Sequence, residues 1–106
     1  MQVRAALSHY EAAYSTLDVA AARAVWPAVD ANALGRAFDD LRSQHVSLGN
    51  CSVVIGPGRP SARADCTGAA TWTPKVGGGA RTAARRWTFE LELAGDRWQI
   101  VRAITR

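Results

Sequence analysis

The stretch RRWTFELELAGDRWQIVR, residues 85–102, reads as two antiparallel strands joined by a tight turn. Its apolar residues occupy alternate positions, with Trp87, Phe89, Leu91 and Leu93 before the turn and Trp98 and Ile100 after it. Ile104 follows just beyond the stretch. Alternation of this kind is typical of strands that have one buried face and one polar face. The stretch therefore predicts a hairpin at the C-terminal end of the sequence.

Two further strands are predicted upstream of this hairpin. From His45 the apolar residues again alternate, but their parity changes before Cys51, which indicates a bulge at Gly49-Asn50. GPGRP at 56–60 supplies a turn, and the return strand carries small residues on one face: Ala62, Ala64, Cys66, Gly68 and Ala70. PKVGGGA at 74–80 separates this strand from the next. We therefore expect four strands in an antiparallel meander.

Before Ser43 the spacing of apolar residues is helical. The first helix is predicted over about 3–16, with one apolar stripe formed by Val3, Leu7, Tyr10, Tyr14 and Leu17. The opposite, polar face carries Arg4, Ser8, Glu11 and Ser15. Asp18 and Asp30 are suited to cap a second and a third helix, and Pro27 ends the second. In the third helix we expect Leu34, Phe38 and Leu41 to point inward and Arg36, Asp39 and Asp40 outward.

Length and composition restrict the class of protein. A chain of 106 residues forms a single domain, here residues 1–106. No apolar run approaches the roughly 20 residues of a membrane-spanning helix, so no membrane span is predicted. The net charge of +4 comes from arginines that are scattered, with only Arg81, Arg85 and Arg86 clustered, and nucleic-acid binding is not expected. Two His and two Cys are too dispersed for a metal site, and we predict neither a metal nor a cofactor.

Three segments together resemble the NTF2-like superfamily, the cone-shaped fold of SnoaL-like cyclases and ketosteroid isomerases. They are VRAALSHYEAAYSTLDVAAARAVWP at 3–27, FDDLRSQ at 38–44 and RRWTFELELAGDRWQIVRA at 85–103. The resemblance implies an α+β fold in which three N-terminal helices pack on the concave face of a curved four-stranded antiparallel sheet and leave a conical cavity. ATWTPKVGGGAR at 70–81 also resembles accessory domains of bacterial multidomain proteins, which suggests a domain taken from a larger protein.

The resemblance also suggests a ligand pocket. In ketosteroid isomerases a helix tyrosine donates a hydrogen bond to the substrate oxygen, helped by a carboxylic acid, and a separate carboxylate moves the proton. Tyr10 lies where that tyrosine would be, and Tyr14 is one turn on. The candidate pocket residues are Tyr10, Tyr14, Trp26, Trp72 and Trp87. The alternative is that these aromatic residues only pack the core.

The sequence places a hydrogen-bond donor, a helix tyrosine, in the expected cavity, but no evident base. Asp65, Glu90 and Glu92 alternate with apolar residues and should point away from the cavity. His45 begins a strand and His9 lies beside the helical stripe, so we expect neither to act as a catalytic acid or base. We therefore assign no catalytic residue. We therefore expect a non-catalytic module that binds a small apolar ligand or a protein partner. The alternative is a small isomerase-like or cyclase-like enzyme that uses a helix tyrosine as hydrogen-bond donor.

The two cysteines are equidistant from the middle of the GPGRP turn, so Cys51 and Cys66 should face each other across the strand pair. Opposed residues at a non-hydrogen-bonded site have Cα atoms about 4.5 Å apart, within reach of a disulfide. A disulfide would suggest an extracytoplasmic location, and two free thiols a cytoplasmic one. The outer sheet face carries Thr67, Thr71, Thr73, Thr88 and Val101, a surface suited to a homodimer.

Overall fold

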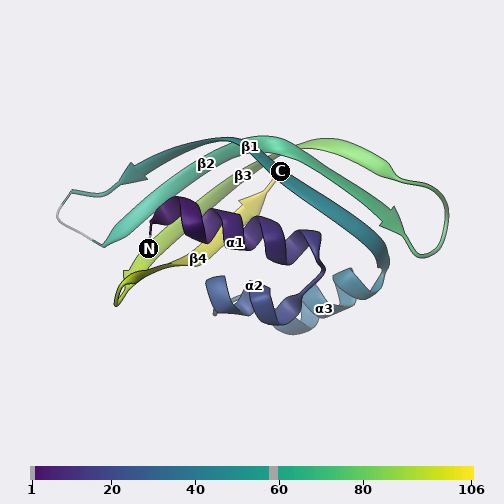
Figure 1. Ribbon diagram of the computed structural model, residues 1–106, viewed down its shortest axis with the longest axis horizontal. Coiled ribbons are helices and arrows are strands. Elements are labelled where there is room, and N and C mark those ends of the chain that lie inside the picture. The colour runs from purple at the N-terminus through teal and green to yellow at the C-terminus, as the bar shows by residue number, and fades with distance from the viewer. Residues whose placement is uncertain (1, 58–59) are drawn as a thin grey trace.

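A computed structural model describes residues 2–57 and 60–106 of the chain. Its elements follow the predicted order of helices and then strands: α1 (Val3–Ser15), α2 (Val19–Val25), α3 (Ala31–Asp39), β1 (Leu41–Ile55), β2 (Ser61–Pro74), β3 (Arg81–Ala94) and β4 (Arg97–Thr105). The strands form one antiparallel sheet in the order β1-β2-β3-β4. The sheet arches over the helices, which lie on its concave side (Figure 1). The predicted α+β fold is confirmed.

Asp18 and Asp30 cap helices as predicted. The Asp18 carboxylate accepts a hydrogen bond of 3.0 Å from the Ala21 backbone N–H, and Asp30 accepts one of 3.0 Å from Ala33. The expected end of the third helix is wrong, because Leu41 starts β1 opposite Pro74 instead of continuing α3. Helix and strand meet at Asp40 without a loop, and at such a junction an apolar residue fits either element.

The pairing of β1 with β2 contains the bulge that the change of parity predicted. The register shifts between Ser47 and Asn50, and Gly68 lies opposite the irregularity. A Cβ atom at Gly68 would overlap the Ser47 carbonyl oxygen and approach the Gly49 backbone nitrogen. Only a glycine fits here, since the two backbones approach each other too closely for a side chain. The GPGRP turn falls partly on 58–59, which lie outside the described residues.

A second irregularity changes which residues of β4 face the helices. The register between β3 and β4 shifts at Glu90 and Leu91, so that Ile104 pairs with Thr88 and Thr105 with Trp87. The expectation that Ile104 shares the inner face with Ile100 is therefore wrong. Thr105 lies on the inner face in its place, because one extra residue in a strand reverses the alternation beyond it.

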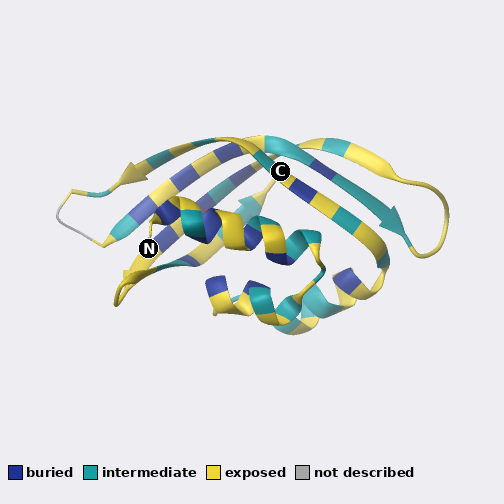
Figure 2. Cartoon of the chain, viewed as in Figure 1, coloured by how far each residue is buried: buried dark blue, intermediate teal, exposed yellow. Residues whose placement is uncertain are grey.

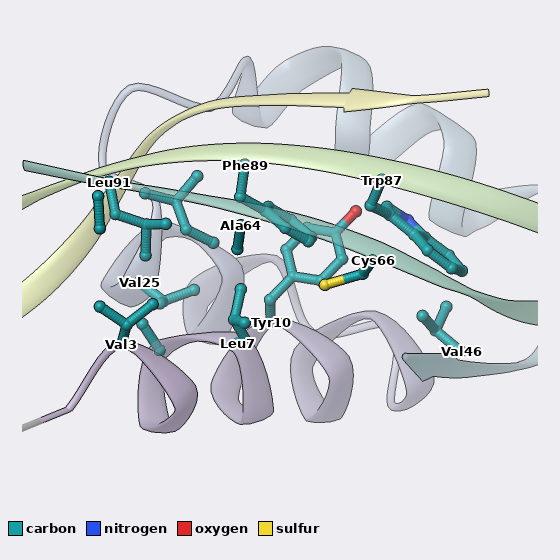
Figure 3. Close-up of a cluster of buried hydrophobic side chains, with 13 residues drawn as sticks. Val3, Leu7, Tyr10, Val25, Val46, Ala64, Cys66, Trp87, Phe89 and Leu91 are labelled. Carbon is teal, nitrogen blue, oxygen red and sulfur yellow. The ribbon is translucent and has the colours of Figure 1, made fainter. Parts of the chain in front are cut away.

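The core lies between α1 and the concave face of the sheet (Figures 2 and 3). Its buried residues are Val3, Ala6, Leu7, Tyr10, Val25, Val46, Ala62, Ala64, Cys66, Trp87, Phe89, Leu91 and Ile100. Along the strands buried and exposed residues alternate (Figure 2). Two apolar residues near strand ends, Ile55 and Leu93, are exposed. Within the described ranges, no helix is both long enough and apolar enough to cross a membrane.

The polar face of α1 contacts the edge strand β1. The Leu48 backbone N–H donates a hydrogen bond of 2.7 Å to Glu11 Oε2, and the Val46 N–H donates one of 2.9 Å to Ser15 Oγ. An edge strand has backbone groups that no neighbouring strand can satisfy. Side chains of α1 satisfy two of them, and so fix the helix along the edge of the sheet.

Cys51 and Cys66 are direct partners in the β1–β2 register and form a disulfide, with their Cα atoms 4.1 Å apart. The predicted pairing is confirmed. Cys66 is buried in the core beneath α1, whereas Cys51 is half-buried. The disulfide therefore joins the edge strand to the part of the sheet that the helices cover.

Candidate functional site

A cavity of about 460 Å³ opens on the concave side of the sheet, where β1 and β2 extend past α1 toward α3. Its volume is in the range that small-molecule sites occupy. The residues that line it come from α1, the end of α3 and all four strands: Tyr10, Tyr14, Ala37, Asp40, Leu41, Gln44, Val46, Ala70, Trp72, Arg85, Trp87 and Thr105. Most of these side chains are apolar or aromatic, with two charged groups among them.

Aromatic rings pack together at one wall of the cavity. The ring of Tyr10 stacks on that of Tyr14, with centroids 4.1 Å apart, and meets Phe89 edge-on at 4.9 Å. Tyr14 in turn meets Phe38 edge-on at 5.4 Å. Such pairs each contribute about 0.5–1.5 kcal/mol beyond the burial of area. The two tyrosines therefore pack the core and line the cavity at the same time; Tyr10 is only 3% exposed, and Tyr14 is half-buried.

Both tyrosine hydroxyls stay protonated at neutral pH. Burial raises the pKa of Tyr10, and hydrogen bonds with Thr105, Tyr14 and Trp87 offset part of that rise. The Tyr10 hydroxyl is directed toward the Trp87 indole (Figure 3). Burial also raises the pKa of Tyr14, and its interaction with Tyr10 raises it further. Neither hydroxyl is therefore suited to act as a base, and each already has a hydrogen-bond partner within the protein.

Arg85 and Asp40 bring opposite charges to the cavity. The Arg85 guanidinium lies over the Trp72 ring, 5.6 Å from its centroid. Asp40, the C-cap of α3, is exposed to solvent, as predicted, and it also lines the cavity. The chain turns from α3 into β1 at this residue, which places it at the cavity edge.

The strand carboxylates lie on the outer face, as their alternation predicted. Asp65 is exposed and forms an ion pair with Arg63, and Glu90 is exposed and pairs with Arg102. Hydrogen bonds from Arg63 and Thr88 lower the pKa of Asp65. His9 and His45 are exposed and do not line the cavity. In the part of the chain that the structure describes, no group of three or more His, Cys, Asp or Glu could hold a metal ion.

The cavity brings together four of the five pocket residues that the sequence suggested: Tyr10, Tyr14, Trp72 and Trp87. Trp26 is not among the lining residues, because it follows α2 and packs half-buried against the core. Sequence reasoning missed Arg85, although a signal for it exists. Arg85 has the same parity in β3 as Trp87, which predicts that it faces inward.

Solved structures identify the fold. An NTF2-like superfamily protein from Salmonella enterica superposes with a TM-score of 0.84 at 11% identity, covering 96% of this chain and 85% of that one. A candidate dehydratase of the NTF2-like family from Streptomyces avermitilis has a TM-score of 0.83 at 14% identity, covering 98% and 92%. A ketosteroid isomerase-like protein from Erwinia carotovora atroseptica has a TM-score of 0.68 at 21% identity, covering 97% and 91%.

No protein-family model and no curated protein sequence matches this chain. The likeness is therefore one of structure, and it shows that the chain has the NTF2-like fold that its sequence resembled. Proteins with this fold do not share one chemistry, so the function has to be argued from the cavity itself.

Proposed function

We propose that this domain binds a small, largely apolar ligand in the cavity between α1, the end of α3 and the concave face of the sheet. The observation that carries this proposal is the cavity of about 460 Å³ lined by Tyr10, Tyr14, Trp72 and Trp87. Flat aromatic side chains around a concave site favour a flat, apolar ligand. A ligand that buries about 200 Å² of apolar surface gains about 5 kcal/mol before the costs of association, so we expect an affinity in the millimolar range.

A variant that fills the cavity tests this proposal. Ala70 lines the cavity, and Ala69, its neighbour in β2, faces the other side of the sheet. We expect Ala70→Phe to abolish binding of 2-naphthamide, a neutral bicyclic probe, in an NMR titration, and Ala69→Phe to leave it unchanged. Thermal unfolding of both variants checks that they fold. Equal binding by Ala70→Phe and the unchanged protein would contradict the proposal.

One observation favours a second candidate function, a proton-transfer enzyme. Two of the structurally similar proteins are a candidate dehydratase and a ketosteroid isomerase-like protein. The cavity combines hydrogen-bond donors at Tyr10 and Tyr14 with a carboxylate at Asp40. In such an enzyme Tyr14 would donate to a substrate carbonyl while Asp40 takes a proton from the adjacent carbon. Turnover of a β,γ-unsaturated ketone that Asp40→Asn abolishes would favour this function over binding alone.

We also propose that the outer face of the sheet mediates association with a second copy. Two threonine hydroxyls on this face, those of Thr71 and Thr82, hydrogen-bond to each other at 2.9 Å, and the small residues Ala69 and Ala84 pair beside them. The ion pairs Arg63–Asp65 and Arg102–Glu90 lie nearer the other end of the sheet. Light scattering that finds only monomer at high concentration would contradict this dimer.

The disulfide supports an oxidising compartment for the domain.

A further inference from the structure

We propose that Arg85 gives the cavity a preference for anionic ligands, so that its ligand class is aromatic carboxylic acids. This inference rests on the proposed function, since it assigns a chemical class to the ligand of the same cavity.

The position of Arg85 in β3 directs it into the cavity. Strand residues of one parity share a face, and Trp87 and Phe89 are buried on the inner one. Arg85 has their parity and lines the cavity, while Arg86 is exposed on the outer face. The residue directly opposite Arg85 is Gly68, where the backbone of β1 occupies the place of a side chain.

Arg85 is a half-buried residue that forms an ion pair with no carboxylate within residues 2–57 and 60–106. The ion pairs found there join Arg63 to Asp65 and Arg102 to Glu90. The described contact of the Arg85 guanidinium is with the face of the Trp72 ring, which leaves its N–H groups at the ring edge available. A partly desolvated cation is unfavourable without a partner, and a carboxylate matches the guanidinium with two parallel hydrogen bonds.

The Trp72 ring also fixes how such a ligand would bind. A guanidinium stacked on an indole loses less conformational freedom when it binds a carboxylate than one that is free in solvent. The carboxylate would meet the edge of the guanidinium, and the ring of the ligand would lie among the apolar side chains of the cavity. An aromatic acid can contact both the guanidinium and the apolar side chains, whereas a neutral aromatic compound gains only the apolar contacts.

Asp40 lines the same cavity and opposes an anion there. Its side chain is exposed, whereas Arg85 is half-buried and held by Trp72. A solvated charge acts weakly on a ligand because water and salt screen it, and a partly buried charge is screened much less. The two charges form no ion pair in the described structure, so Arg85 is not neutralised by Asp40. The attraction by Arg85 therefore outweighs the repulsion by Asp40.

A matched pair of probes tests the inference. 2-Naphthoate and 2-naphthamide have the same ring and nearly the same size, and they differ in charge. We expect the protein to bind 2-naphthoate about tenfold more tightly in calorimetric titrations, in line with a charge-assisted bidentate contact. Arg85→Gln should remove that preference by weakening 2-naphthoate alone. Arg86→Gln, which removes the same charge from the outer face, should retain it.

The outcomes separate this inference from the proposed function. Equal affinity for the two probes, or a preference that survives Arg85→Gln, overturns the role of Arg85 and leaves the cavity as a binding site for apolar ligands. Binding of neither probe at millimolar concentration overturns the proposed function itself. A preference that Arg86→Gln removes as completely as Arg85→Gln would reflect the overall charge of the protein, and it too would overturn the inference.

Discussion

Glu11 of α1 accepts a hydrogen bond of 2.7 Å from the backbone N–H of Leu48, within the irregular part of β1. The contact joins residues 37 positions apart in sequence and satisfies an edge-strand donor that no strand reaches. The helix is therefore positioned by hydrogen bonds along its polar face as well as by the packing of its apolar face. This arrangement gives a first prediction.

We expect Glu11→Ala to lower the free energy of unfolding by about 1–3 kcal/mol, because it leaves a partly buried N–H without an acceptor. Glu11→Gln keeps an acceptor oxygen and should recover most of the loss. Ser8→Ala is the matched control, since Ser8 lies on the same face of α1 and is exposed. Urea unfolding measures all three variants, and an Ala variant as stable as the unchanged protein would contradict the role of Glu11.

Gly68→Ala should be among the most damaging single substitutions in the sheet. A Cβ atom there would overlap the backbone of Ser47, so the bulge has to shift. We expect a loss of about 2 kcal/mol or more. In contrast, a Cβ at Gly35 in α3 meets nothing within 4 Å. Gly35→Ala should therefore stabilise the protein by up to about 1 kcal/mol through its helix propensity. A similar effect of the two substitutions on the thermal midpoint would show that the close approach at Gly68 is not limiting.

Reduction of the disulfide should destabilise the domain. Cys51 and Cys66 are 15 residues apart in sequence, and closing a loop of that length contributes about 3 kcal/mol by restricting the unfolded chain. We expect the urea midpoint to fall when dithiothreitol is added. The double variant Cys51→Ala, Cys66→Ala should unfold at the lower midpoint with or without the reductant. A midpoint that the reductant leaves unchanged would contradict this prediction.

Stability should also fall at alkaline pH. Burial raises the pKa of Tyr14 above the ordinary value of 10.0, and it raises the pKa of Tyr10 in the same direction. The folded protein therefore holds these protons more tightly than the unfolded chain. Their contribution is fully present below pH 10 and is lost as the pH rises above it. These are the two tyrosines of the chain, so tyrosinate absorbance reports on them alone. Ionisation of both at the ordinary pKa in folded protein would contradict the assignment.

Asp40→Asn tests the charge balance of the cavity. Removing the carboxylate removes its repulsion of an anion, so we expect affinity for 2-naphthoate to rise about two- to threefold, the effect of a screened, exposed charge. Affinity for 2-naphthamide should not change. Asp39→Asn is the control, because Asp39 is also exposed but does not line the cavity. Weaker binding of 2-naphthoate by Asp40→Asn would contradict the expected repulsion.

The sequence predicted those features that depend on local patterns. The alternation in β3 assigns Trp87 and Phe89 to the inner face, and the symmetry of the turn pairs Cys51 with Cys66. Trp26 could not be placed in the same way, because its surroundings depend on how α2 packs against the rest of the core.

Two residues of the cavity show different limits of sequence reasoning. Asp40 fits either the end of a helix or the start of a strand, and only the junction between α3 and β1 places it at the cavity. The inward position of Arg85 was predictable from its parity with Trp87, but from the sequence we considered it only as one of three clustered arginines.

The hydrogen bonds from β1 to Ser15 and Glu11 also affect how this protein meets other chains. A free edge strand is a template for intermolecular strand addition, which leads to domain swapping and amyloid-like aggregation. The N–H groups of Val46 and Leu48 are already bonded to α1, so an incoming strand cannot pair with the middle of β1 without displacing the helix. The first helix thus protects the folded chain against aggregation at this edge.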